Sequence, residues 1–210
     1  MRVKKFFGAL IGMLLCFATV VSTAACSKTP SMTVTAEEWQ TAFSAERFVN
    51  SKISVTFFIP DGVSYLEYVA ADGVEYYHQT VVEGENIRED TSYSQRMENG
   101  YKMYEQQTNG WEISDYERSI FEVSGLSVMI EMFADNYESF TYDEAQNGYI
   151  FIVDETEMVV IFRCWFEEGT LSAWSYESIF ILNESIDYTV YNVSVTFGGQ
   201  QVEIPDLREA

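Results

Sequence analysis

The sequence predicts an α+β domain built on a curved antiparallel β-sheet, a half-open barrel with two helices covering its concave face. From residue 52 onwards, apolar and polar residues alternate with a period of two, as in half-buried strands. Turn dipeptides such as Asp72-Gly73 separate the alternating segments, which is typical of antiparallel hairpins. Apolar residues recur at helical spacing near residues 35–48 and 124–137.

The first 25 residues have the order of a secretory signal peptide. Arg2, Lys4 and Lys5 are positive, residues 6–21 are apolar, and residues 22–25 are small. A permanent membrane anchor is the alternative, because the apolar run approaches the roughly 18 residues needed to span a bilayer. The small residues before the cysteine favour cleavage.

Cys26 is the expected site of a lipid anchor. The tetrad Thr23-Ala24-Ala25-Cys26 resembles a bacterial lipobox, although Thr23 stands where Leu is usual. Cleavage after Ala25 that leaves a free thiol is the alternative. Two acyl chains, such as palmitate, at about 0.8 kcal/mol per buried CH₂ give stable anchoring. We therefore expect a lipidated Cys and tether at residues 26–33, on the outer, extracytoplasmic face of the cell membrane.

The chain is strongly acidic, with 33 acidic and 12 basic residues and a net charge of −21. Loss of the signal segment removes three basic residues and makes this charge −24. Such a surface repels phosphate, so we expect no nucleic-acid partner. The acidity indicates either cation binding or a surface kept soluble by charge. We expect a monomer with one domain, at residues 34–206.

The first predicted helix has several agreeing start signals. Thr35 is a favourable N-cap, Glu38 completes a capping box, and Val34 can pack onto Trp39. The helix is expected to end near Phe48. Strands are then expected at residues 52–59, 65–70, 74–82, 92–97 and 101–107, from Trp111, and at 148–154, 158–167, 171–182, 188–197 and 201–204.

One face of the late strands is apolar throughout, and two helices are few for so wide a sheet. Either the sheet closes tightly on itself, or it stays open with the helices over a hydrophobic space. The second case predicts a ligand cavity. Its expected lining is Trp39, Phe43, Met129, Ile130, Phe133, Val160, Phe162, Cys164 and Phe166. An ordinary filled core made of the same residues is the alternative.

The order of elements resembles a known group of bacterial lipoproteins. The lipobox is followed by a tether, the helix "TAEEWQTAF", hairpins with "YY", a mid-chain helix and the ending "YTVYNVSVTFGGQQVEIP". This layout resembles the LolA/LolB and LppX/LprG superfamily, especially its uncharacterised Gram-positive members. The resemblance implies a half-open barrel whose helices plug a cavity for lipid or acyl chains, with Cys26 as the anchor position.

Residues that could carry catalysis are few, and we expect neither an enzyme nor a cofactor. His78 is the one histidine and lies in a Tyr-rich strand, where a sheet-surface role is favoured over a general base. Cys164 is surrounded by aromatic residues, so burial should raise the pKa of its thiol. No zinc-ligand spacing is present, and the acidic loop at residues 83–90 is interpreted as solvated rather than as a calcium site.

The sequence is compatible with two functions. The first is a membrane-anchored carrier or sensor that binds a lipid or other hydrophobic ligand between the sheet and the helices. The second is a non-enzymatic surface interaction module with a filled core. In that case exposed aromatics would contact a protein or glycan partner, the candidates being Tyr65, Tyr68, Tyr104 and Trp111.

Overall fold

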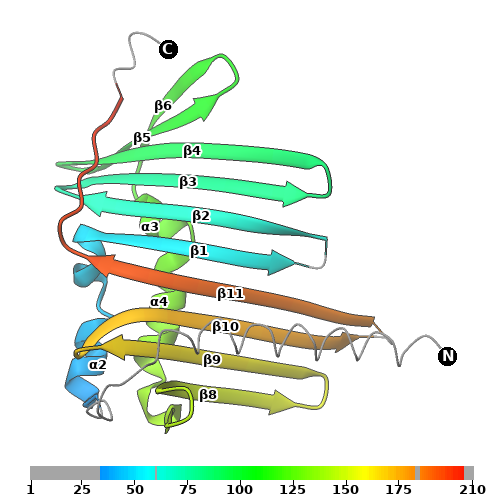
Figure 1. Ribbon diagram of the computed structural model, residues 1–210. Helices are drawn as coiled ribbons and strands as arrows, with labels where there is room; N and C mark the ends of the chain where they lie inside the picture. The colour runs from blue at the N-terminus through cyan, green and yellow to red at the C-terminus, as the bar shows by residue number, and fades with distance from the viewer. Residues whose placement is uncertain (1–33, 60, 183–184, 206–210) are drawn as a thin grey trace. The chain divides into compact units, whose positions relative to one another are not determined.

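The computed structural model describes residues 34–59, 61–182 and 185–205, which form one large antiparallel sheet with few helices (Figure 1). The sheet has 11 strands in the order β6-β5-β4-β3-β2-β1-β11-β10-β9-β8-β7. Because β6 and β7 are not paired with each other, the sheet is open. The predicted open antiparallel sheet is thus confirmed. The expected signal segment 1–25, Cys26 with its tether to residue 33, and residue 206 lie outside the described residues.

The strands follow the chain as a meander on either side of the helical segment. Their bounds are β1 (Ser51–Ile59), β2 (Gly62–Ala71), β3 (Val74–Glu83), β4 (Asn86–Met97), β5 (Gly100–Gln107), β6 (Gly110–Tyr116), β7 (Thr141–Asp143), β8 (Gly148–Glu155), β9 (Met158–Glu167), β10 (Thr170–Leu182) and β11 (Ser185–Phe197). No helix in these described ranges is long and apolar enough to cross a membrane.

The first helix starts as predicted but ends earlier. In α2 (Ala36–Ala42), the Glu38 carboxylate accepts a bond from Thr35 N at 2.7 Å and Glu38 N donates to Thr35 Oγ1 at 3.3 Å, which confirms the capping box. Ser44 donates its hydroxyl to the Thr41 carbonyl at 3.0 Å, and serine bonds of this kind compete with the helical ladder. A 3₁₀ helix, η1 (Ala45–Asn50), follows, so the prediction of one helix to Phe48 is wrong.

The mid-chain helix is confirmed as α4 (Leu126–Asp135), with a short α3 (Ile120–Val123) before it and the 3₁₀ turn η2 (Tyr137–Ser139) after it. Gly125 separates α3 from α4 with a φ of 81°, a left-handed conformation that glycine adopts without steric cost. Neither α3 nor the three-residue strand β7 is visible as a period in the sequence, because both are too short.

Two details of the predicted strands are corrected. The expected loop at residues 83–90 is only a two-residue turn at Gly84 and Glu85, because β4 already begins at Asn86. The segment 201–204, predicted as a strand, lies in no strand of the sheet. By contrast, the hairpin at Asp72-Gly73 is confirmed, with φ angles of 52° and 79° as a tight two-residue turn requires.

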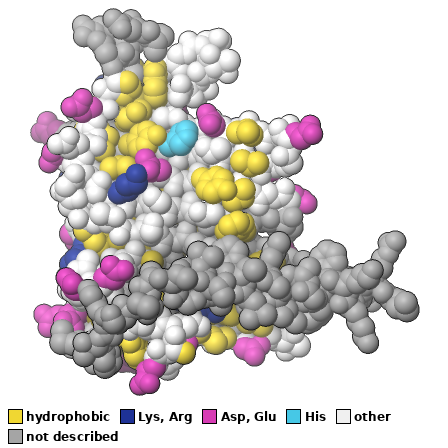
Figure 2. Space-filling model, in the orientation of Figure 1, with side chains coloured by type: hydrophobic (Ala, Val, Ile, Leu, Met, Phe, Trp, Pro, Cys, Tyr) yellow, Lys and Arg dark blue, Asp and Glu magenta, His cyan; other side chains and the backbone are white. Residues whose placement is uncertain are grey.

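The sheet has two chemically different faces. The inner face carries the core residues Ile53, Tyr68 and Trp174, and the helices contact it: Phe43 of the α2 C-cap and Phe133 of α4 lie 6.5 and 6.3 Å from the Trp174 ring. Figure 1 shows α3 and α4 on this side of the strands. Figure 2 shows the opposite, outer face, where hydrophobic side chains are interspersed with charged and polar ones.

Candidate functional site

The residues predicted to line a cavity are brought together on the inner face. All of them except Met129 are buried, and Met129 is half-buried against the same cluster. Their rings are in direct contact: Trp39 lies 5.2 Å from Phe43 and 5.6 Å from Phe166, and Phe133 lies 5.7 Å from Phe162. These contacts make the predicted lining part of one buried aromatic cluster.

Trp39 ties the two helices together at the centre of this cluster. Its Nε1 donates to the Phe133 carbonyl at 2.9 Å, a bond between α2 and α4 that satisfies a buried indole. Nearby, Val34 N donates to the Tyr149 hydroxyl at 2.6 Å, which joins the start of the domain to β8. On β10, Trp174 Nε1 lies 3.1 Å from the Met129 sulfur. The helices are therefore held onto the sheet by polar bonds as well as by apolar packing.

Next to this cluster, five aromatic side chains cross five neighbouring strands in one line. We call this line the aromatic row; it consists of Phe57, Tyr191, Tyr176, Phe162 and Phe151. Each residue is the direct cross-strand partner of the next, on β1, β11, β10, β9 and β8. Successive ring centroids are 4.1, 5.8, 5.3 and 5.4 Å apart; the first pair is stacked, and the other three distances are typical of favourable aromatic pairs.

Burial of the inner face decreases at the aromatic row. The adjacent register row is buried throughout and consists of Val55, Val193, Trp174, Cys164 and Tyr149. In the aromatic row only Phe162 is buried, and the other rings are half-buried. Partial burial raises the pKa of Tyr191, with Tyr176 as the second cause, so its hydroxyl is a neutral hydrogen-bonding group at ordinary pH.

The two residues considered for catalysis, His78 and Cys164, lie at the sheet surface and in the core, respectively, as the sequence predicts. His78 is on the outer face of β3, and its Nδ1 and Nε2 lie 3.0 and 3.3 Å from the hydroxyls of Thr91 and Thr80. Cys164 is 0% exposed, and burial raises the pKa of its thiol, which disfavours the nucleophilic thiolate. Within the described ranges, no group of three or more His, Cys, Asp or Glu side chains is placed to hold a metal ion.

Two of the aromatics expected on the surface are buried instead. Tyr68 is 2% exposed because its position in β2 turns it to the inner face, where its hydroxyl donates to Glu75 at 2.9 Å. Tyr104 is 9% exposed, whereas Tyr65 is 50% exposed on the outer face. A period of two separates the faces of a strand but does not say which face is covered, so the sequence alone does not distinguish Tyr65 from Tyr68.

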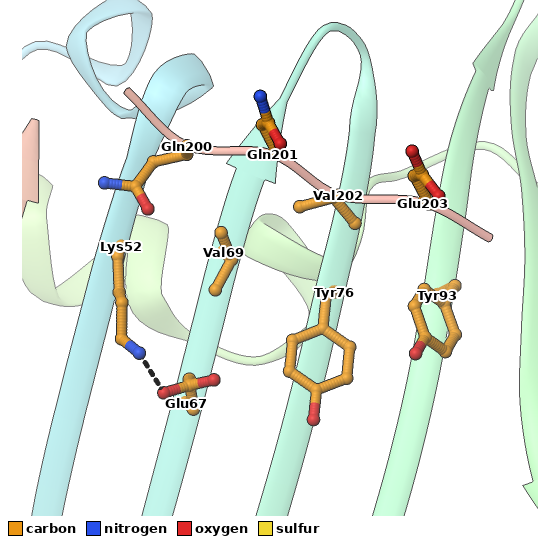
Figure 3. A pocket seen from close by; sticks show the side chains of 9 residues that line it. All are labelled: Lys52, Glu67, Val69, Tyr76, Tyr93, Gln200, Gln201, Val202 and Glu203. Atoms are coloured by element: carbon orange, nitrogen blue, oxygen red, sulfur yellow. Dashed lines mark ion pairs between the residues drawn. The ribbon is translucent and has the colours of Figure 1, made fainter. Parts of the chain in front are cut away.

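A groove of about 350 Å³ lies on the outer face of β1 to β4 (Figure 3). Its floor is a register row of Lys52, Val69, Tyr76 and Tyr93, with Glu67 beside it. The chain segment 200–203 crosses over these strands and forms the upper wall. The sequence does not indicate this groove, because the pattern of residues 201–204 predicts one more strand and not a segment that crosses over the sheet.

A second hollow is formed by residues 155–158 in the turn between β8 and β9. Its lining is Glu155, Thr156, Glu157 and Met158, a short stretch of consecutive residues. Neither this hollow nor the outer groove is lined by any residue of the predicted cavity.

Comparison with known proteins gives no assignment. No protein-family model and no curated protein sequence matches the chain. Among solved structures, the chain is similar to the S-type phycobiliprotein lyase CPES from Guillardia theta, with a TM-score of 0.27 and 7% identity. The similarity covers 74% of this chain and 91% of that chain. So low a TM-score supports no inference about the function of this chain.

Proposed function

We propose that the chain is a lipid-anchored extracytoplasmic protein that binds a lipid or similar apolar molecule along the aromatic row. In this proposal the open sheet is a half-open barrel with α2 and α4 over its concave face. The observation that carries the proposal is the incomplete burial of four of the five aligned aromatic rings beside a fully buried row. Apolar surface left open in this way is a common mark of a binding site.

The aromatic row is continuous with the helix-covered core at one end. Phe162 contacts Phe133 of α4, and Phe151 lies 5.6 Å from Phe140, which follows η2. Toward β1, the row continues through Tyr176 and Tyr191 to Phe57. An acyl chain laid across these rings would gain about 25 cal/mol for each Å² of apolar surface removed from water.

Two chemical features suit such a ligand. Tyr176 and Tyr191 each combine an apolar ring with a hydroxyl, so they can contact both an acyl chain and a polar group attached to it. Met129 and Met132 of α4 are half-buried against the core, and their flexible side chains adapt to ligands of different shape. The predicted cavity residues then form the closed wall behind the ligand, and the aromatic row forms its contact surface.

The test uses the full chain with Cys26→Ala, which has no thiol at the expected anchor position. We expect native mass spectrometry and solvent extraction to reveal a co-purified lipid, and a fluorescent fatty acid to bind. Tyr191→Ala should weaken binding of the probe about tenfold, because it removes roughly 1.5 kcal/mol of apolar contact. Tyr65→Ala removes an exposed ring of the outer face and should leave binding unchanged.

Tyr191→Phe provides the matched control, since it keeps the ring and should keep most of the affinity. Thermal unfolding of each variant checks that the fold is retained. The absence of any co-purified lipid, together with no binding of the fatty-acid probe to the Cys26→Ala chain, would exclude the carrier function.

A further inference from the structure

The wall of the outer groove is fixed by the backbone after β11, which changes direction and is hydrogen-bonded where it crosses the sheet. Gly198 and Gly199 follow β11 with φ angles of 77° and 70°, a left-handed pair that redirects the chain over the outer face. Gly198 N donates to the Asn50 carbonyl at 2.9 Å, and the Gln200 amide donates back to the Gly198 carbonyl at 2.9 Å. Segment 200–203 is therefore attached at the edge of the groove that it walls.

One ring in the floor of the groove, Tyr76, turns its face outward. His78, on the same outer face, is hydrogen-bonded to Thr91 on the neighbouring strand and to Thr80 on its own strand. The ring of Tyr76 is within 3° of parallel to that imidazole, with centroids 6.4 Å apart. Figure 3 shows Tyr76 with a face of its ring turned outward.

The groove floor has tilted aromatic rings on one side of Tyr76 and charged side chains on the other. Tyr93 lies 5.1 Å from Tyr76 and is tilted by 48°, and Trp111 of β6 lies 5.6 Å from Tyr93. On the opposite side, Lys52 and Glu67 form an ion pair, and both side chains remain partly exposed. The groove floor is thus aromatic at one end and offers a hydrogen-bond donor and acceptors at the other.

We infer that the outer groove binds a neutral saccharide. A sugar ring has a face of C–H groups and an edge of hydroxyls, so it can stack on Tyr76 while its hydroxyls bond to Lys52, Glu67 and the Gln200 amide. Lys52 is paired with Glu67, and the chain carries a net charge of −21, so an acidic sugar would be repelled. This site is separate from the aromatic row, which is on the other face of the sheet.

Two other ligand classes fit the groove less well. An organic cation prefers an enclosing aromatic cage, whereas here the rings form an open floor. An acyl chain would place its apolar surface against the Lys52–Glu67 ion pair, and desolvating these charges costs free energy.

The experiment titrates the detergent-purified full chain with cellotetraose and chitotetraose, two neutral oligosaccharides, by calorimetry. We expect at least one of them to bind, and Tyr76→Ala to weaken its binding about tenfold through loss of the stacking face. Tyr76→Phe should bind within about twofold of the unchanged chain, because it keeps the ring. Tyr65→Ala, on the same face but outside the groove, should have no effect.

Several outcomes would overturn the inference. They are no binding of either tetrasaccharide, unchanged binding by a folded Tyr76→Ala chain, and binding of tetramethylammonium in place of the sugars. If Tyr76→Ala lowers the thermal unfolding temperature too far, Gln200→Ala provides the second test and should weaken binding from the rim. Tyr191→Ala changes the inner face only, so saccharide binding should persist in this variant. The saccharide result therefore does not depend on whether the lipid proposal is correct.

Discussion

The carboxylate of Glu75 joins three strands and a helix through its hydrogen bonds. Oε1 accepts from the Tyr68 hydroxyl at 2.9 Å, and Oε2 accepts from Ser94 Oγ at 2.5 Å and from Ile120 N at 2.8 Å. The last bond satisfies an N–H at the start of α3 that has no partner within the helix. Burial and the nearby Glu75 charge raise the pKa of Tyr68, so its hydroxyl remains a donor.

At this residue we predict that Glu75→Gln lowers the free energy of unfolding by about 1–3 kcal/mol. The amide keeps one acceptor oxygen but turns an NH₂ group toward a donor, either Tyr68 or the Ser94–Ile120 pair. Urea unfolding measures the change. Glu85→Gln, in the exposed turn between β3 and β4, is the control and should change stability by less than about 0.5 kcal/mol. Equal stability of the two variants would contradict the role of Glu75.

The sequence indicates the environments of His78 and Cys164 but not the role of Glu75. The Tyr-rich setting of His78 and the aromatic setting of Cys164 can be read from residues one to three positions away in the same strand. The partners of Glu75 are 7, 19 and 45 residues distant along the chain. Contacts of this kind depend on strand register and on the position of α3, which local patterns do not contain.

At the scale of elements, helix starts and turns follow from short-range chemistry. The Thr35–Glu38 capping box spans three residues, so it is complete in the sequence and present in the structure. The start of β4 is not indicated, because residues 86–90 are exposed on both faces and therefore show no alternation of apolar and polar residues. Strand prediction depends on a buried face, and this part of β4 has none.

For α2 we predict that Thr35→Ala lowers the free energy of unfolding by about 1 kcal/mol, since the N–H of Glu38 loses its acceptor. Thr35→Ser keeps a hydroxyl in the same place and should recover most of the loss. Chemical denaturation of the three chains gives the comparison. A Thr35→Ser chain as unstable as Thr35→Ala would show that the hydroxyl is not what stabilises the helix start.

At the scale of the whole molecule, the first and last strands of the chain pair with each other. β1 is hydrogen-bonded to β2 on one side and to β11 on the other, so these two strands lie side by side in the middle of the sheet. This pairing places Phe57 beside Tyr191 and completes the aromatic row. It also positions the segment after β11 to cross the outer face of β1 to β4.

The proposed lipid anchor also concerns the whole molecule. We expect the Cys26→Ala protein not to be attached to the membrane by lipid. The mature protein should be released into the medium, or the uncut precursor should accumulate, because one acylated cysteine supplies the membrane affinity. Fractionation and immunoblotting separate these forms, with Cys164→Ala as the control that keeps the anchor position. A Cys26→Ala chain that loses its signal segment and still remains membrane-bound would contradict the lipid anchor.

By itself, the sequence determined the elements that depend on neighbouring residues: the α2 capping box, the Asp72-Gly73 hairpin, and the apolar face of β9 from Val160 to Phe166. Only the tertiary structure decided which strands pair, where helix coverage of the inner face ends, and how segment 200–203 walls a groove. The physical reason is that register and coverage arise from contacts between distant parts of the chain. Both candidate binding surfaces, the aromatic row and the outer groove, are products of those contacts.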